Sequence, residues 1–318
     1  MTTFSWPGYP KSISDFEALM AAIDSTLASE GLRPFQRPIH VGRKFWEAFR
    51  WEGQVLPPKA LADNSGFDGN ILMAKAHRWY EETYGDRLKS DWAFGYAPTR
   101  LGNAIWRVRA PVTYGQVRLF IDRNMKNQGI RLGSRGTEAS LNVLCEVEGL
   151  PQGLVDRLTD HALHEHFEFH VFMHENLQWR EELPQTDLLT LARADYDEST
   201  AAVLGHRFAQ ARWASQQAVE KTLKGLLSIA GTRYPTGGPN GHDLQHIGGL
   251  LKQHHGIDVS TALLSVAACS PKVRYGEEAS SEEQALHANH AVLGVLEQLR
   301  KDPRTHQILS LTSAQHGT

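Results

Sequence analysis

The stretch FAQARWASQQAVEKTLKGLL (residues 208–227) decides the fold of the second half of this 318-residue chain. Its apolar and small residues recur at steps of three and four, which is the period of an α-helix. Polar Gln216, Gln217 and Glu220 lie on the same stripe as small alanines, and this mixture favours close helix–helix packing with hydrogen bonds between helices. We therefore expect a helix over 206–230 that suits a self-pairing surface.

The same helical period continues on both sides of this stretch. It predicts further helices over 188–204, 242–254, 258–269 and 281–301, and no strand pattern interrupts them. The expected fold of residues 185–302 is an all-α, up-and-down helical bundle, followed by a tail over 303–318.

Residues 1–184 show a different pattern. Helical spacing predicts helices over 12–31, 70–88 and 151–179, whereas residues 33–68 are rich in proline, glycine and aromatics and are expected to be irregular. Apolar residues alternate over 92–96 and 141–147, and residues 105–112 and 116–121 also have a pattern typical of strands. We therefore expect an α+β domain with a small antiparallel sheet.

Four features of the second half resemble the HEPN family, the higher eukaryotes and prokaryotes nucleotide-binding domains. Residues 208–227 are similar to the family's helix signature, and Gly241-His242-Asp243-Leu244 and Val273-Arg274-Tyr275-Gly276 follow in the expected order, before a last helix with His287 and His290. The resemblance covers about residues 188–300. It implies nucleotide or RNA binding in a stress, defence or regulatory setting, and a homodimer formed through the bundle. It also implies that Lys221, Lys224, Arg274 and Tyr275 contact the nucleotide.

Many HEPN domains are metal-independent ribonucleases, in which an arginine precedes a histidine by four to six residues near the start of the last helix. Here Arg274 precedes His287 and His290 by a longer interval. Elsewhere in the sequence, arginine–histidine pairs with the family's spacing are no more frequent than chance predicts. We therefore expect binding without cleavage. A ribonuclease remains the alternative, with His287 or His290 moving the proton and Arg274 stabilising phosphate charge.

A second candidate site for phosphate lies in the first half. Between Arg100 and Thr137, eight basic side chains stand against the single acid Asp122. Arginine donates two hydrogen bonds at once to phosphate, and the interleaved aromatics could stack bases. The alternative is a solvated surface balanced by the acidic residues of 160–198. The candidate phosphate contacts are Arg107, Arg109, Arg118, Arg123, Arg131 and Arg135.

His166, His170 and His174 stand at four-residue steps and so share one face of the predicted helix over 151–179. Neutral imidazoles at this spacing can chelate zinc or another divalent ion, which would support a metal-dependent activity. We favour the alternative of a polar helix face with histidine–glutamate pairs. The sequence implies no other cofactor.

Composition excludes several classes of protein. Two cysteines cannot form a disulfide framework or an all-cysteine metal site, and the net charge of −3 gives no overall positive field for nucleic acid. No apolar run is long enough to span a bilayer, and the first residues lack the pattern of a secretory signal. We therefore expect a cytoplasmic protein without membrane contact.

Overall fold

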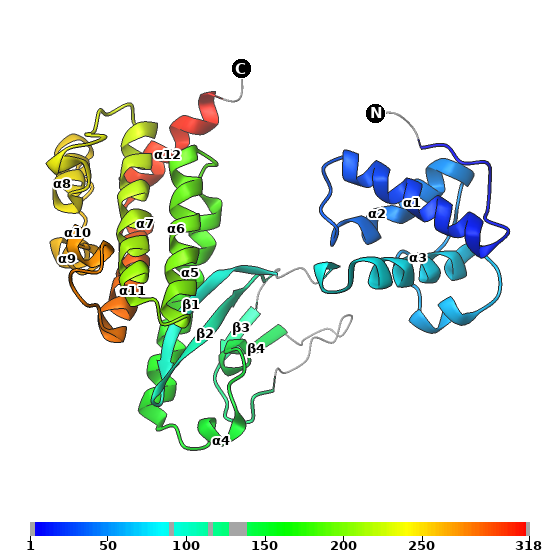
Figure 1. Ribbon diagram of the computed structural model, residues 1–318, viewed down its shortest axis with the longest axis horizontal. Helices are drawn as coiled ribbons and strands as arrows, with labels where there is room; N and C mark the ends of the chain where they lie inside the picture. The colour runs from blue at the N-terminus through cyan, green and yellow to red at the C-terminus, as the bar shows by residue number, and fades with distance from the viewer. Residues whose placement is uncertain (1–3, 89–91, 114–116, 127–138, 316–318) are drawn as a thin grey trace. The chain divides into compact units, whose positions relative to one another are not determined.

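The computed structural model describes residues 4–88, 92–113, 117–126 and 139–315 (Figure 1). The chain divides into two compact units, Met1–Asp91 and Trp92–Thr318. Most of the described residues are helical, and none of their helices is both long and apolar enough to cross a membrane.

The first unit is helical. It contains α1 (Ile13–Ser29), α2 (Arg37–Phe49) and α3 (Gly69–Tyr84), with short 3-10 turns at Lys59–Asp63 and Gly85–Leu88. The prediction that residues 33–68 are irregular is wrong for α2. Pro38 lies in the first turn of α2, where a helix does not need the missing N–H. Val41 and Phe45 then recur four residues apart on its buried face.

The second unit begins with an antiparallel hairpin of β1 (Ala93–Leu101) and β2 (Ala104–Pro111), so the predicted small antiparallel sheet is confirmed. A separate parallel pair, β3 (Val117–Phe120) and β4 (Ala139–Asn142), was not expected. The predicted strand over 141–147 ends early, because the Asn142 side chain accepts a hydrogen bond from Leu144 N at 3.2 Å and starts a 3-10 turn at Val143–Glu146.

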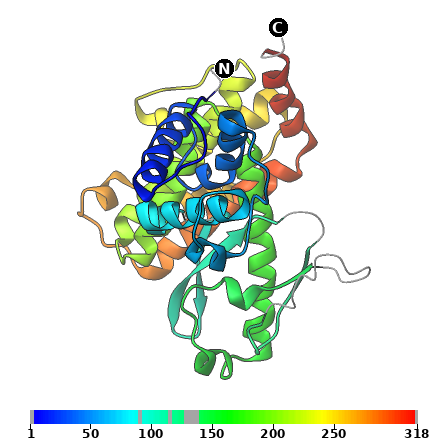
Figure 2. The same ribbon diagram turned by 90° about the vertical axis from the view of Figure 1, so that its right-hand side faces the viewer.

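The predicted helix over 151–179 is two helices, α4 (Gln152–Val155) and α5 (Asp160–Glu182). They separate because Thr159 caps α5, its side chain accepting a hydrogen bond from Ala162 N. Figures 1 and 2 show β1 and β2 alongside one half of α5, and both strands contact it.

The predicted helices of the second half are confirmed. We refer to α5 and the following helices together as the bundle: α6 (Asp187–Leu204), α7 (Phe208–Ile229), α8 (Leu244–His255), α9 (Thr261–Ala267), α10 (Pro271–Arg274), α11 (Glu282–Lys301) and α12 (Pro303–Gln315). The expected tail is the helix α12, whose first turn Asp302 caps by accepting a hydrogen bond from Arg304 N. The central helix is α7, which contacts every one of α6 and α8 to α12.

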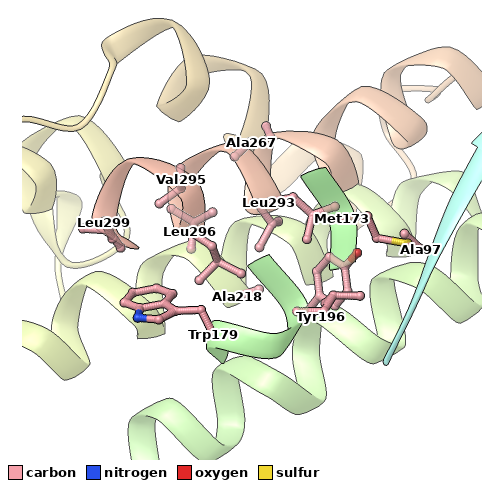
Figure 3. Packing of buried hydrophobic residues seen from close by; sticks show 14 of the residues in the cluster. Ala97, Met173, Trp179, Tyr196, Ala218, Ala267, Leu293, Val295, Leu296 and Leu299 are labelled. Atoms are coloured by element: carbon pink, nitrogen blue, oxygen red, sulfur yellow. The ribbon is translucent and has the colours of Figure 1, made fainter. Parts of the chain in front are cut away.

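One apolar core runs from the hairpin through the bundle. Figure 3 shows its members from β1, α5, α6, α7, α9 and α11, among them Ala97, Met173, Trp179, Tyr196, Ala218, Ala267 and Leu293. Because the hairpin and α5 share this core with α6 and α11, the structure divides the chain after Asp91, whereas the sequence predicted a boundary after residue 184.

Candidate functional site

Three polar side chains of α7 lie inside the bundle. Gln216, Glu220 and Lys224 are each about 5% exposed or less. The Lys224 ammonium donates to Glu220 Oε1 at 2.8 Å and to the Gly241 carbonyl at 2.7 Å. It therefore faces a buried carboxylate and not a phosphate, contrary to expectation. The stripe predicted for self-pairing is used within the single chain.

Lys221 is also paired. Its ammonium lies 2.5 Å from Asp195 Oδ2 of α6, and both side chains are mostly covered. This ion pair ties α7 to α6, so the positive charge of Lys221 is balanced at its own position.

His242 lines a surface hollow that is described below, and Glu220 of α7 orients its ring. Its Nδ1 is 3.0 Å from Glu220 Oε2, and more than half of the side chain is exposed. A carboxylate only accepts, so Nδ1 carries the proton and Nε2 is left for a ligand. The next residue, Asp243, caps α8 by accepting hydrogen bonds from Gln245 N and His246 N. The sequence did not single out His242, although the Gly-His-Asp-Leu motif contained the signal.

Arg274 and Tyr275 lie on an exposed aromatic surface. The guanidinium carbon of Arg274 is 4.4 Å from the centroid of Trp213 and 5.6 Å from that of Tyr275, which is 71% exposed. A hollow of about 490 Å³ opens here between Arg207, Phe208, Ala209, Gln210, Trp213 and Arg274.

A second hollow, of about 630 Å³, is also lined by Trp213. Arg212, His242, Asp243 and Ser270 are among its other lining residues. The Arg212 guanidinium donates to Ser280 Oγ at 3.2 Å. We call the two hollows, which share Trp213, the Trp213 face. It combines a flat aromatic ring with a cation in each hollow, Arg274 and Arg212, which is suited to a planar anionic ligand.

Of the two candidate catalytic histidines, His290 contacts elements other than those around Arg274. His290 Nε2 donates to the Pro98 carbonyl of β1 at 2.8 Å, and its ring packs 4.6 Å from that of Phe169. Burial lowers the pKa of His290, although its bond to Pro98 opposes the shift. His287 is exposed on α11. The contacts of His290 are with the hairpin and α5, whereas those of Arg274 are with α7 and Tyr275.

Arg107 and Arg109 of β2 both meet carboxylates. Arg109 Nε donates to Glu146 at 2.7 Å, and Arg107 donates to Glu148 at 3.3 Å while it lies flat on Tyr96 at 3.5 Å. Arg107 also lines a cavity of about 580 Å³, whose other walls come from β1, α5 and α6. Both arginines thus pair with acids of the first half, Glu146 and Glu148, whereas the alternative named the acidic residues of 160–198.

The remaining candidate arginines are dispersed. Arg123 donates to the carbonyls of Val155 and Leu158 and pairs with Asp160, so it holds the turn before α5 in place. Arg118 is exposed on β3. Arg131 and Arg135 lie outside the described residues.

The three histidines of α5 that were candidate metal ligands are buried. His166, His170 and His174 are 2%, 0% and 8% exposed, so the expected exposed polar face is wrong for them. Histidine–glutamate pairs do occur on the outer face, at His161–Glu165 and His164–Glu168.

Burial holds His166 and His170 in the neutral form. His174 Nε2 donates to the Pro111 carbonyl at 2.9 Å. Burial lowers the pKa of His166 to about 4 and that of His170 to about 3, and two neighbouring imidazoles add to the shift of His170. Within the described ranges, no three or more histidine, cysteine, aspartate or glutamate side chains are grouped so that they could hold a metal ion.

Comparison of the chain with protein-family models, curated proteins and solved structures gives no match. The resemblance to HEPN domains therefore rests on the sequence motifs of the second half alone.

Proposed function

We propose that the protein binds a nucleotide or single-stranded RNA on the Trp213 face. The observation that carries the proposal is the stacked pair of Arg274 and Trp213, beside the exposed ring of Tyr275. Aromatic rings stack on bases of any sequence, and arginine adds contacts to the backbone phosphates.

The dimensions and charges of the face support this proposal. Its hollows of about 490 and 630 Å³ fall within the range of small-ligand sites, about 300–1,000 Å³. Arg212 has a neutral hydroxyl as its hydrogen-bond partner, which leaves further guanidinium donors for phosphate. The resemblance of this region to HEPN domains points to the same class of ligand.

The geometry favours binding over the alternative of a metal-independent ribonuclease. A proton-transfer histidine has to reach the same phosphate as the arginine. The Nε2 atom of His290 is instead bonded to the Pro98 carbonyl, and its ring packs on Phe169.

The test is a binding titration with a labelled single-stranded RNA in EDTA, at low and at high salt. We expect affinity to fall steeply with salt, because phosphate contacts release counterions. Trp213→Ala and Arg274→Ala should each weaken binding by about tenfold, the loss of one stacking contact. Lys252→Ala serves as the control. This exposed lysine of α8 pairs with Asp258 and lines neither hollow.

Absence of binding at low salt would refute the proposal, as would equal affinities for the wild type and Trp213→Ala. The RNA recovered from the titration also tests the alternative. Cleavage in EDTA that is lost in an Arg274→Ala/His290→Ala double variant would establish a ribonuclease.

We also propose that the protein forms a homodimer through the bundle, as the HEPN resemblance implies. The stripe of Gln216, Glu220 and Lys224 is buried within the chain, so the contact has to use the outer surface of the helices. Light scattering over a range of concentrations should give twice the mass of one chain. The mass of a single chain at every concentration would refute the dimer.

A further inference from the structure

The Gly-His-Asp-Leu segment places a titratable side chain in the second hollow of the Trp213 face. We propose that His242 makes nucleotide or RNA binding at this face depend on pH, because its protonated ring supplies a positive charge for phosphate beside Arg212. This inference rests on the function proposed above and adds its regulation.

The contacts of His242 fix its ring without burying it. Both carboxylate oxygens of Glu220 lie close to Nδ1, at 3.2 and 3.0 Å, and the side chain is 55% exposed. Among the residues that the structure describes, Nε2 of His242 makes no hydrogen bond. Protonation therefore adds a donor at Nε2, which belongs to a residue that lines the hollow.

The charge of Glu220 does not cancel the added proton. Glu220 is 4% exposed and is already paired with the ammonium of Lys224 at 2.8 Å, which is itself buried. The Glu220–Lys224 pair is neutral as a whole. Protonated His242 therefore adds a net positive charge, which can attract an anionic ligand that enters the hollow from solvent.

The other charges around the hollow nearly balance. Arg212 of α7 and Arg274 of α10 oppose Asp243, which caps α8, and Glu278, which accepts a hydrogen bond from Ser270. His246 on the first turn of α8 and the Cys269 thiol, whose pKa burial raises, are further titratable groups next to this site. With His242 neutral, these four charges sum to zero, so one added proton gives the hollow a net positive charge.

Histidine is the side chain that ordinarily changes charge between about pH 5 and 8. We therefore expect affinity for an anionic ligand to increase as the pH falls through this range. One charge-assisted hydrogen bond to phosphate at low salt corresponds to about a tenfold change in the dissociation constant.

The experiment repeats the titration with labelled single-stranded RNA in EDTA at low salt, at about pH 6 and about pH 8. The wild type should bind about tenfold more tightly at the lower pH. His242→Ala should bind weakly at both values, and His242→Lys, which stays charged, should bind tightly at both. His254→Ala is the matched control, because His254 is an exposed histidine at the far end of α8 and should behave like the wild type.

Different outcomes separate the two proposals. If the wild type binds RNA at neither pH, the proposed function fails and the regulation fails with it. If RNA binds but His242→Ala keeps the pH dependence of the wild type, only the inference about His242 is overturned. Weak binding by a folded His242→Lys variant at the lower pH would also overturn it.

Discussion

His166 and His170 bring four ring nitrogens into the interior of the second unit, and none of these atoms has a hydrogen-bond partner among the described residues. Both histidines are less than 3% exposed. A buried imidazole without an acceptor or an anion nearby is stable only when neutral. These side chains therefore make the fold sensitive to acid.

The free energy of unfolding should decrease as the pH falls below about 6.5. The unfolded chain takes up protons at the ordinary histidine pKa of 6.5, whereas folding lowers the pKa of His166 to about 4 and that of His170 to about 3. Each histidine contributes a loss of up to about 1.4 kcal/mol per pH unit in this interval. Urea unfolding at about pH 7 and about pH 5 measures the difference.

The variant His170→Leu should reduce that difference between the two pH values, because it removes one of the two buried groups. The exposed His161 provides the control, since His161→Gln should leave the pH dependence unchanged. Equal pH dependence in wild type and His170→Leu would contradict this explanation.

Gly95 allows the buried Arg180 to approach β1. Its φ of +148° lies in the region that favours glycine, and a Cβ there would stand 2.8 Å from Arg180 Nη2. That nitrogen donates to the Phe94 carbonyl at 2.9 Å.

Gly95→Ala should therefore lower the free energy of unfolding by about 1–3 kcal/mol. In Gly249→Ala, by contrast, the new methyl group meets no neighbour, and α8 should become more stable by about 0.5–1 kcal/mol. Chemical denaturation of both variants measures these two changes in the free energy of unfolding. A Gly95→Ala variant as stable as the wild type would contradict the close approach.

At the scale of the element, α7 depends on a buried ion pair. Removal of Lys224 leaves the Glu220 carboxylate, 4% exposed, without its cation. Lys224→Met should cost about 3–5 kcal/mol, because an uncompensated buried charge is strongly destabilising. Lys221, also on α7, forms a partly exposed ion pair with Asp195 of α6. Lys221→Met removes that pair and should cost less than about 1 kcal/mol.

The double variant Glu220→Gln/Lys224→Met tests the cause. It removes both charges and should recover part of the stability lost in Lys224→Met. If the double variant is less stable than Lys224→Met, packing and not charge explains the loss. Thermal and urea unfolding of the wild type and the three variants would give the comparison.

Helix positions could be predicted well where the apolar period is regular. The predicted helix over 188–204 corresponds to α6 within one residue, and that over 281–301 corresponds to α11 equally closely. The helix α2 was missed because Pro38 and the surrounding glycines and aromatics resemble a loop in composition.

The site could be predicted only in part. Arg274 and Tyr275 were expected to meet a ligand and do lie on an exposed aromatic surface. The position of His242 depends on Glu220, 22 residues earlier, and local patterns carry no information on such a contact. Lys224 was misjudged for a different reason: a lysine charge suggests solvent, whereas its ammonium is bound by the buried Glu220 carboxylate four residues earlier and by the Gly241 carbonyl.

At the scale of the whole molecule, the shared core predicts which fragments fold. Tyr196 and Leu293 belong to the same cluster as Ala97 of the hairpin and Met173 of α5. A fragment of residues 92–318 keeps this core complete. A fragment of residues 185–318 exposes the half of the core that the hairpin and α5 cover.

We therefore expect residues 92–318 to unfold cooperatively, and residues 185–318 to lack a cooperative transition or to aggregate. Circular dichroism during heating, together with size-exclusion chromatography, checks both fragments. Cooperative unfolding of residues 185–318 as a soluble species would instead support a domain boundary after residue 184.

The hydrogen bond between His290 and Pro98 joins residues that are 192 positions apart. On the ribosome, the hairpin leaves the exit tunnel long before α11 has been translated. Because α5 follows sooner and packs on both strands, it can cover part of the hairpin during elongation. The part of β1 that contacts α11 stays uncovered until nearly all of the remaining chain has been translated. During that interval chaperones can bind it.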